Sequence, residues 1–455
     1  MPRGFHPLIA AQFCSALADN ALLIVAIAVL AERGLPAWWA PMLKLGFTLS
    51  YVVLAPAVGP LADAFPKRRL MAWANTLKIV GVLALLGGVH PVAAFVVVGL
   101  GAAAYAPAKY GLVTELVPGP RLVAANGWLE VSVVAAVLLG TGLGGLLVSP
   151  WWQTAAWPRA AAQALASAGL GTGQAAAIVL LLGLYGIAAV WNLAVPDSGA
   201  RYPATDWRPL PLWRDFCASN RVLWRDPEGG LSLAVTTIFW GVGATLQFVV
   251  LRWAGEVLAL PLAQSAWLQV VVAVGVVVGA SAAGRWVPLR AAHRMLGFGV
   301  ALGLLMPVVA ATTTLVLAVP LLMGVGAVGG LLVVPLNALL QHRGCQLLSA
   351  GRSIAVQGGN ENASVLVMLA VYAALLALEL PILGVMIGFG LVIALAMALL
   401  MRRAAATGAS ACAAMRTFSR WFCAVIGWPR LSSALPPRAV TINTVSLPAW
   451  RPSAP

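Results

Sequence analysis

Twelve long apolar segments, separated by polar connections, follow one another along the chain. We predict one membrane-spanning helix in each of them: 8–31, 42–64, 70–89, 92–117, 124–148, 175–196, 231–254, 264–288, 295–314, 316–341, 353–378 and 381–401. Each segment has close to the roughly 20 apolar residues that a helix needs to cross a bilayer. The pattern therefore predicts an all-α polytopic membrane protein with 12 transmembrane helices in two six-helix halves.

The longer polar or mixed stretches divide this pattern. Residues 1–196 form the N-terminal six-helix half and residues 230–402 the C-terminal half, and a basic cytoplasmic linker loop, 197–229, joins them. Residues 149–174 are rich in Trp, which suits an interfacial loop at headgroup depth. The tail, residues 403–455, is rich in Arg, Pro and Ser, so we expect it to be cytoplasmic and mostly disordered.

The composition excludes several classes of protein. Hydrophobic residues make up 61% of the chain and charged residues 9%, against about 45–50% and about 25% in soluble domains. A soluble enzyme, a fibrous protein and a disordered chain are therefore excluded. The chain also lacks a GxxxxGK[ST] loop, an HExxH metal motif and a GxSxG elbow. We expect no enzyme activity, no cofactor and no metal.

We attribute the net charge of +15 to cationic loops that set the orientation of the chain in the membrane, and not to binding of nucleic acid. Cationic loops beside membrane spans are held on the cytoplasmic side, against anionic lipid. If the N-terminus is cytoplasmic, that side receives most of the Lys and Arg residues, whereas the opposite loops near His90, 315 and 380 contain none. We therefore expect both termini to be cytoplasmic and membrane lipids, not nucleic acid, to be the partners of these charges.

Ionisable and amide side chains inside the predicted spans are the candidate functional residues. An ionisable group there costs at least ~2.5–3.5 kcal/mol unless it is paired or faces a wet cavity. The candidates are Asp19, Asn20, Lys109, Glu130, Asn337, Gln341, Gln357, Glu361 and Asn362. Each of them could instead make only a structural bond between helices. Lys109 could also snorkel to the membrane edge, and Lys78 is expected to snorkel or to be structural.

The two halves show signs of an internal repeat. Pro107 and Pro335 each break a late span of their half, and the same offset carries Asp19 onto Gln247 in the first span of the second half. Six-span halves related in this way predict a substrate route between them.

The loop between the second and third spans carries a recognisable motif. Gly59, Asp63, Lys67, Arg68 and Arg69 follow the pattern of a glycine, an aspartate and a basic cluster. This pattern resembles, in degraded form, the loop motif of the major facilitator superfamily. We expect the aspartate to cap or pair and the cations to hold the loop inside.

Longer runs narrow the resemblance. The segments from Ala11 to Leu23, Gly101 to Gly111, Ala125 to Glu130, Val334 to Gln341 and Ile354 to Asn362 look like those of bacterial lysophospholipid transporters of that superfamily. The resemblance covers roughly residues 8–402. It does not cover the tail, and 149–174 looks longer than the family's loop.

This resemblance implies a function, a location and a partner. It implies a major facilitator fold in the bacterial inner membrane that moves lysophosphatidylethanolamine and lysophosphatidylglycerol from the outer to the inner leaflet by facilitated diffusion. A separate acyltransferase/acyl-carrier-protein synthetase, for which the tail is too short, would re-acylate them on the cytoplasmic face. Asp19, Lys109, Glu130 and Glu361 match charged positions of the family, which implies headgroup contact or gating.

One position departs from the family. After Phe239-Trp240-Gly241 an arginine is expected where this chain has Gln247, although Arg252 lies five residues further on. Five residues turn a helix by ~500°, so Arg252 lies about 140° away from that face. The headgroup contacts are therefore expected to involve Lys109, Arg252 or a neutral group.

Two other functions remain open on the sequence. The same fold could be a proton-coupled exporter of amphipathic solutes, with Asp19 or Glu361 as the protonatable group. A non-transporting scaffold for lipid-remodelling enzymes would instead tolerate neutralisation of both carboxylates.

Overall fold

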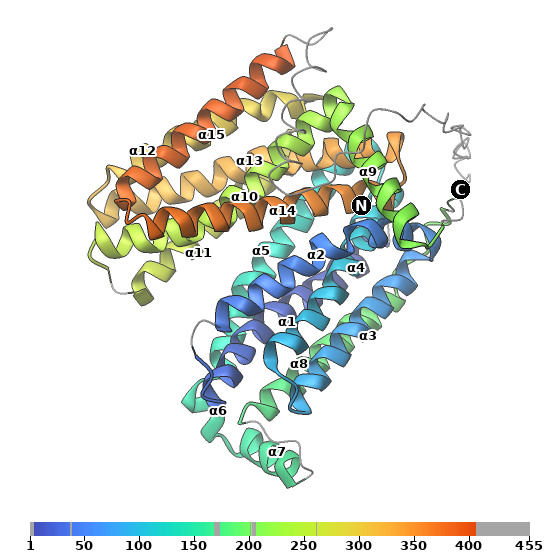
Figure 1. Ribbon diagram of the computed structural model, residues 1–455, viewed down its shortest axis with the longest axis vertical. Helices are drawn as coiled ribbons and strands as arrows, with labels where there is room; N and C mark the ends of the chain where they lie inside the picture. Colours follow the sequence, from blue (N-terminus) through green and yellow to red (C-terminus); the bar gives the residue numbers. More distant parts are fainter. Residues whose placement is uncertain are drawn as a thin grey trace, which may run out of the picture.

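The computed structural model describes residues 4–36, 39–167, 173–200, 202, 206–260 and 262–405 (Figure 1). Of the predicted tail, 403–455, all but the first three residues lie outside the described part. The α-helices are α1 (Phe5–Glu32), α2 (Trp39–Ala64), α3 (Lys67–Leu86), α4 (Pro91–Leu116), α5 (Leu122–Leu147), α6 (Pro150–Thr154), α7 (Ala156–Ser167), α8 (Ala175–Leu193), α9 (Pro209–Arg225), α10 (Pro227–Glu256), α11 (Leu262–Trp286), α12 (Leu296–Ala310), α13 (Leu315–Leu347), α14 (Ala350–Ala377) and α15 (Ile382–Ala405). Two short 3₁₀ helices, Gly119–Arg121 and Leu289–Met295, precede α5 and α12.

Twelve of the described helices are long and apolar enough to cross a membrane. They coincide with the twelve predicted segments, and most ends agree within four residues. The largest difference is at the C-terminus of α13, which continues to Leu347 instead of ending near 341. The predicted class, an all-α membrane protein with 12 spans, is confirmed.

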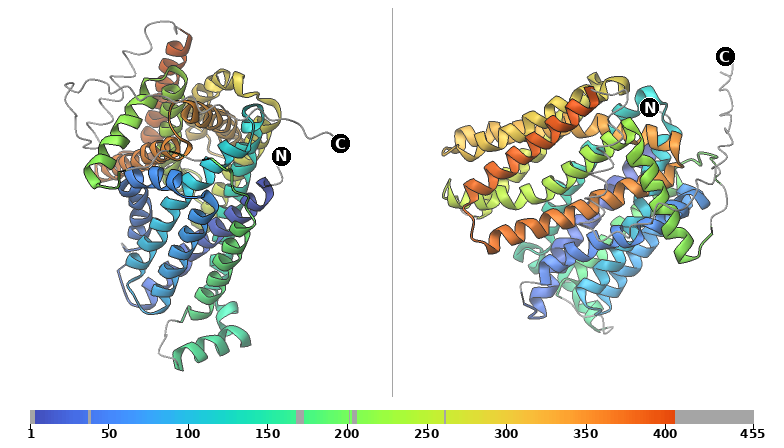
Figure 2. Two further views of the ribbon diagram at one scale, coloured as in Figure 1. Left: turned by 90° about the vertical axis from the view of Figure 1, so that its right-hand side faces the viewer. Right: turned by 45° about the horizontal axis from the view of Figure 1, so that its top comes forward.

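The spans gather in two bundles, which we call the N half (α1–α5 and α8) and the C half (α10–α15). Figures 1 and 2 show the bundles meeting near α9 and diverging away from it. We call the end of the molecule at which the bundles meet the α9 end. We call the opposite end, at which they diverge, the α7 end. Because the number of spans is even, α1 begins and α15 ends at the α9 end.

The apolar core explains why the halves meet at one end. At the α9 end, one cluster of buried side chains contains residues of both halves, such as Leu112 and Leu129 together with Val333 and Ala338, and a second joins Ala55 of α2 to α9 and the C half. At the α7 end, the described residues form one cluster within the N half, around Tyr185, and another within the C half. The halves therefore share a core at the α9 end alone.

Glycines let α11 and α13 pack backbone against backbone inside the C half. A methyl group at Gly275 or Gly279 of α11 would overlap a carbonyl oxygen of α13, and one at Gly326 or Gly330 of α13 would overlap a carbonyl oxygen of α11. Small residues at such contacts let helices pack closely where lipid provides no hydrophobic driving force. This pair is a tight internal contact of the C half.

Two segments predicted as loops contain helices. The interfacial stretch 149–174 holds α6 and α7, and the linker 197–229 holds α9, 17 residues long. The linker reads as a polar, basic loop, yet α9 buries Leu212, Phe216 and Leu223 against the ends of both halves. The apolar positions at i, i+4 and i+11 lie on one helix face, which is the signal that was missed.

Candidate functional site

Asp19 lies in a charge-balanced cluster within the N half. Its Oδ2 accepts a hydrogen bond from Lys78 Nζ at 2.6 Å, and its Oδ1 accepts one from the Tyr185 hydroxyl at 2.6 Å. Lys78 Nζ also donates to Ser15 Oγ at 2.9 Å, and Ser15 donates to Asn75 Oδ1 at 2.9 Å. The five residues come from α1, α3 and α8, so one half alone satisfies this carboxylate. We call them the Asp19 cluster.

Of the two roles expected for Lys78, snorkelling and a structural bond, the structure shows the structural bond. Lys78 does not snorkel, because its side chain is only 2% exposed and is directed to Asp19. Its position deep inside α3 was itself a signal, since a lysine there is as costly as an aspartate without a partner. Because Asp19 and Lys78 each need an opposite charge beside them, an ion pair between the two could have been predicted.

Glu361 lies in a cluster that contains amides and no described cation. Gln357 Nε2 donates to Glu361 Oε1 at 2.8 Å and to Asn337 Oδ1 at 3.0 Å. Gln357 Oε1 is buried and accepts no hydrogen bond from the described residues. No described Lys, Arg or His lies within ion-pair distance of Glu361. We call Asn337, Gln357 and Glu361 the Glu361 cluster; it belongs to α13 and α14.

Lys109 and Glu130 lie on the N half and are both largely buried, at 9% and 7% exposure. Lys109 Nζ lies over the ring of Tyr110, 4.2 Å from its centroid, and makes no ion pair with a described residue. Lys78, Glu130 and Asp19 are each close enough to act electrostatically on Lys109, and both Glu130 and Glu361 act on Tyr110. The structure thus gathers a cation and two carboxylates from the two halves in one region.

Gln341 joins the halves directly. Its amide exchanges two hydrogen bonds with the amide of Asn126 on α5, at 2.9 and 3.0 Å. Asn126 lies one helical turn before Glu130, so this pair is next to the charged region on its α9 side. The sequence marked Gln341 but missed Asn126.

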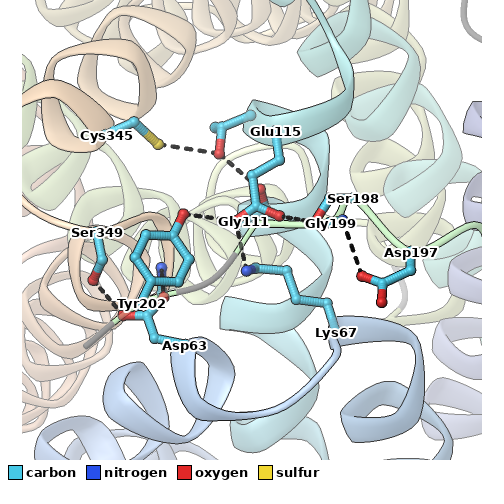
Figure 3. Close-up of polar contacts among 12 residues, drawn as sticks. Asp63, Lys67, Gly111, Glu115, Asp197, Ser198, Gly199, Tyr202, Cys345 and Ser349 are labelled. Atoms are coloured by element: carbon cyan, nitrogen blue, oxygen red, sulfur yellow. Dashed lines mark hydrogen bonds and ion pairs between the residues drawn. The ribbon is translucent and has the colours of Figure 1, made fainter. Parts of the chain in front are cut away.

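The loop motif forms the contact between the halves at the α9 end (Figure 3). Asp63 accepts hydrogen bonds from the Ser349 hydroxyl and, at 2.9 Å, from the Gly351 N–H, so it caps the first turn of α14. Gly59 packs against Arg352 and Gly351, where a side chain would not fit. The capping role expected for Asp63 is therefore present, across the two halves.

Lys67 turns inward instead of lying at the loop surface. Its Nζ pairs with Glu115 at 2.6 Å, and its side chain is 4% exposed (Figure 3). Glu115 also accepts from Ser198 at 2.5 Å and from the Tyr202 hydroxyl at 2.7 Å. Burial and the Glu115 carboxylate raise the pKa of Tyr202, so this hydroxyl stays protonated and donates. The motif thus anchors the start of the linker.

The remaining candidates make local contacts. Asn20 and Asn362 each donate to a backbone carbonyl four residues earlier in their own helix. Arg68 is half-buried and Arg69 exposed, without an ion pair among the described residues. Gln247 is exposed, and Arg252 pairs through Nε with Glu256 at 2.5 Å, while its Nη1 is buried without a partner among the described residues. No described His, Cys, Asp or Glu side chains gather in a group that could hold a metal ion.

Comparisons with known proteins point to one family. The family model described as "Major Facilitator Superfamily" matches residues 8–344. A relative from Shigella flexneri, "Lysophospholipid transporter LplT", is 40% identical over 395 residues, which cover 87% of this chain and 94% of the relative. Its namesake from Escherichia coli (strain K12) is 39% identical over the same coverage.

Solved structures share the fold at low sequence identity. A bacterial homologue of the iron transporter ferroportin, in an outward-facing state, superposes with a TM-score of 0.66 at 15% identity and covers 89% of this chain and 100% of that one. FucP, a major facilitator transporter in the outward conformation, gives a TM-score of 0.62 at 15% identity, with 88% and 98% coverage. At this identity the likeness concerns the fold alone.

Proposed function

The chain belongs to the major facilitator superfamily, and we propose that it moves lysophospholipids from the outer to the inner leaflet of a bacterial inner membrane. The proposed substrates are lysophosphatidylethanolamine and lysophosphatidylglycerol, and the proposed mechanism is facilitated diffusion. About 40% identity to relatives named as lysophospholipid transporters, over 87% of this chain, supports this choice within a large superfamily.

The chemistry of the region between the halves is the observation that carries the proposal. Lys109 supplies a buried cation without a described carboxylate in pairing distance, which suits a lipid phosphate. The Glu361 cluster offers a carboxylate and the free Gln357 oxygen, both hydrogen-bond acceptors. Such acceptors suit the ammonium group of ethanolamine or the hydroxyl groups of glycerol. The N half therefore presents the cation, with Glu130 beside it, and the C half presents only acceptors to one headgroup.

The separate cores at the α7 end fit the proposed direction. The α9 end carries the basic motif loop and the arginines of α9, which favours the cytoplasm for this end. The halves then part on the outer side, where lysophospholipids of the outer leaflet would enter. Asp19 has its own partner in Lys78, so we assign it to positioning α1 against α3 and not to the headgroup.

The proposal includes the fate of the product. A separate acyltransferase/acyl-carrier-protein synthetase at the cytoplasmic face would re-acylate the delivered lipids, which is the remodelling step that follows chemically from a lysolipid.

Uptake of labelled lysophosphatidylethanolamine tests this function. Cells without their own transporter would express the wild type, Glu361→Gln, Lys109→Gln or the control Glu256→Gln, at matched membrane abundance and with or without a proton gradient. Glu256 is a matched control because it is an exposed carboxylate already paired at the α7 end. We expect uptake by wild type and control, at least tenfold less with the two site variants, and no dependence on the gradient.

Each contrary result has a definite meaning. Absence of uptake by well-expressed wild type contradicts lysophospholipid transport. Uptake that collapses with the gradient contradicts facilitated diffusion and favours a proton-coupled transporter with Glu361 as the protonatable group. Full uptake by both site variants contradicts the assignment of the site and favours a scaffold or another route.

A further inference from the structure

The inner face of α9 lies across the seam between the two halves. Asp215 pairs with Arg352 of α14 at 2.9 Å, and Asn360 of α14 donates to Asn220 at 2.9 Å. A small cavity has Pro56 of α2, Phe216 of α9 and Arg352 of α14 in its wall, so the three helices meet there. Because α2 belongs to the N half and α14 to the C half, α9 is attached to both sides of the closed end.

The outer face of the same helix is a basic and apolar stripe. Leu210, Arg214, Ala218, Arg221 and Arg225 follow at spacings of four, four, three and four residues, and all are exposed. Such spacings place side chains on one helix face. Exposed Trp207 and Val222, at 47% and 42%, flank the stripe. We call this face the α9 stripe.

The charges of the α9 stripe are not balanced by the described residues. Arg214, Arg221 and Arg225 make no ion pair there, because the nearby acids Asp206 and Asp226 are engaged by Arg208 and Arg343. Residues 406–455 contain five arginines and no acid, so the tail cannot neutralise the stripe either. An anionic occupant of the stripe would therefore have to come from outside the chain.

The position of α9 selects the membrane surface as that occupant. Arg225 is followed by Asp226 and then by α10, a span of 30 residues. Such a helix is ~45 Å long, against a hydrocarbon core of ~30 Å, so its ends reach into the headgroup layer. The end of α9 is thereby held near the headgroups. Exposed Trp, Leu and Val among arginines suit an interface of lipid headgroups and acyl chains better than an acidic soluble surface.

We propose that the α9 stripe binds anionic phospholipid headgroups of the cytoplasmic leaflet and thereby stabilises the closed α9 end. The inner face holds α2 and α14 together, and lipid on the outer face fixes the helix that makes these contacts. Anionic lipid is then a ligand that favours the state with the α9 end closed, because it binds that state better. The inference rests on a cytoplasmic α9 end and not on the identity of the transported substrate.

Hydrogen–deuterium exchange of the whole protein in nanodiscs tests this inference. One set would contain only phosphatidylethanolamine, and the other would include phosphatidylglycerol at roughly 30%, enough to create a negative surface potential. We expect amides of 209–225 and of 350–357 to exchange about threefold or more slowly with the anionic lipid. About 0.5 M salt should remove the difference, because it screens exposed charges.

A matched pair of triple variants isolates the stripe. Arg214→Gln/Arg221→Gln/Arg225→Gln should abolish the effect of phosphatidylglycerol on both segments. Arg285→Gln/Arg290→Gln/Arg294→Gln removes three exposed arginines from the same end of the molecule and should retain it. The salt series on the wild type decides the question even if a triple variant fails to insert.

Three results would overturn the proposal. Equal exchange of wild-type α9 in both lipids would mean that anionic headgroups are not the occupant and would favour an acidic protein partner. Protection that survives in the α9 variant would assign the effect to other cations. Protection of 209–225 without any change at 350–357 would exclude the stabilisation of the closed end.

Discussion

The Asp19 cluster and the Glu361 cluster each contain a carboxylate at similar depth, but the groups that surround the two carboxylates differ. Asp19 lies fourteen residues into α1 and Glu361 eleven residues into α14, or ~21 and ~17 Å from the α9 end. Asp19 is neutralised by Lys78 within its own half, whereas Glu361 is bonded to the Gln357 amide and the Thr236 hydroxyl and has no described cation in ion-pair distance. Depth alone therefore does not identify a transport residue.

The difference lies in what each carboxylate can still bind. Both oxygens of Asp19 are engaged, by Lys78 and by Tyr185, and the cluster ties α1, α3 and α8 together. The Glu361 cluster retains a buried oxygen without a donor, and Glu361 acts electrostatically on Tyr110, whose ring lies beside Lys109. The first arrangement stabilises one half, and the second is available to a ligand.

Breaking the ion pair between Asp19 and Lys78 is expected to have the largest effect on stability. Asp19→Asn leaves Lys78 buried without an anion, which should lower the free energy of unfolding by about 3–5 kcal/mol. Thermal unfolding in detergent measures this, with Glu256→Gln as the control at an exposed pair. A melting temperature equal to that of the wild type would mean that Lys78 finds another partner.

The uncharged, buried pair of Asn126 and Gln341 is expected to give a stability loss of intermediate size. Asn126→Ala leaves the Gln341 amide without its two bonds, at an expected cost of about 1–3 kcal/mol. Because this pair joins the halves at the α9 end, part of the loss should appear as opening of that end. A variant in which the half-buried Cys345 is the sole cysteine should then react faster with a thiol reagent. Unchanged reactivity would show that other contacts hold the end closed.

Removing both charges of the Asp19–Lys78 pair should cost far less stability than removing one. Asp19→Asn combined with Lys78→Gln leaves no uncompensated charge, so the double variant should lie within about 1 kcal/mol of the wild type in stability. The double-mutant cycle should then give a large coupling energy between these positions. Two additive losses would contradict the pairing.

Substitution of Glu361 is expected to have the smallest effect on stability. Glu361→Gln keeps an oxygen that can accept from Gln357 and leaves no cation behind, so stability should change by less than about 1 kcal/mol. Uptake of labelled lysophospholipid should nevertheless fall at least tenfold. A variant that loses stability and transport together would make Glu361 a structural residue like Asp19.

The membrane-spanning helices were predictable because hydropathy is a local property. A span must be apolar along ~20 residues whatever it packs against, so α1 or α13 can be recognised without its neighbours. Amphipathic helices outside the spans are harder. The apolar residues of α9 are buried only because α2, α10 and α14 lie beneath them, and the basic residues between them indicated a loop.

The partners within the site were not predictable for a different reason. Lys78 is 59 residues from Asp19, and Asn126 is 215 residues from Gln341. Because a buried charge is costly, it indicates that a partner exists. For this reason Asp19 and Glu361 could be singled out. It does not say which of several polar residues that partner is, because the choice depends on how α1 and α5 lie against α3 and α13.

The backbone contact between α11 and α13 has a consequence for natural variation in this protein. At Gly275, Gly279, Gly326 and Gly330 any larger residue would push the two helices apart, so these positions should stay fixed as the chain diverges between species. Gly142, Gly145, Gly183 and Gly186 have open space around them and should drift freely. Both groups lie in apolar spans of similar composition. Evolutionary constraint on a glycine of this chain should therefore follow the neighbouring backbone and not the hydropathy of its segment.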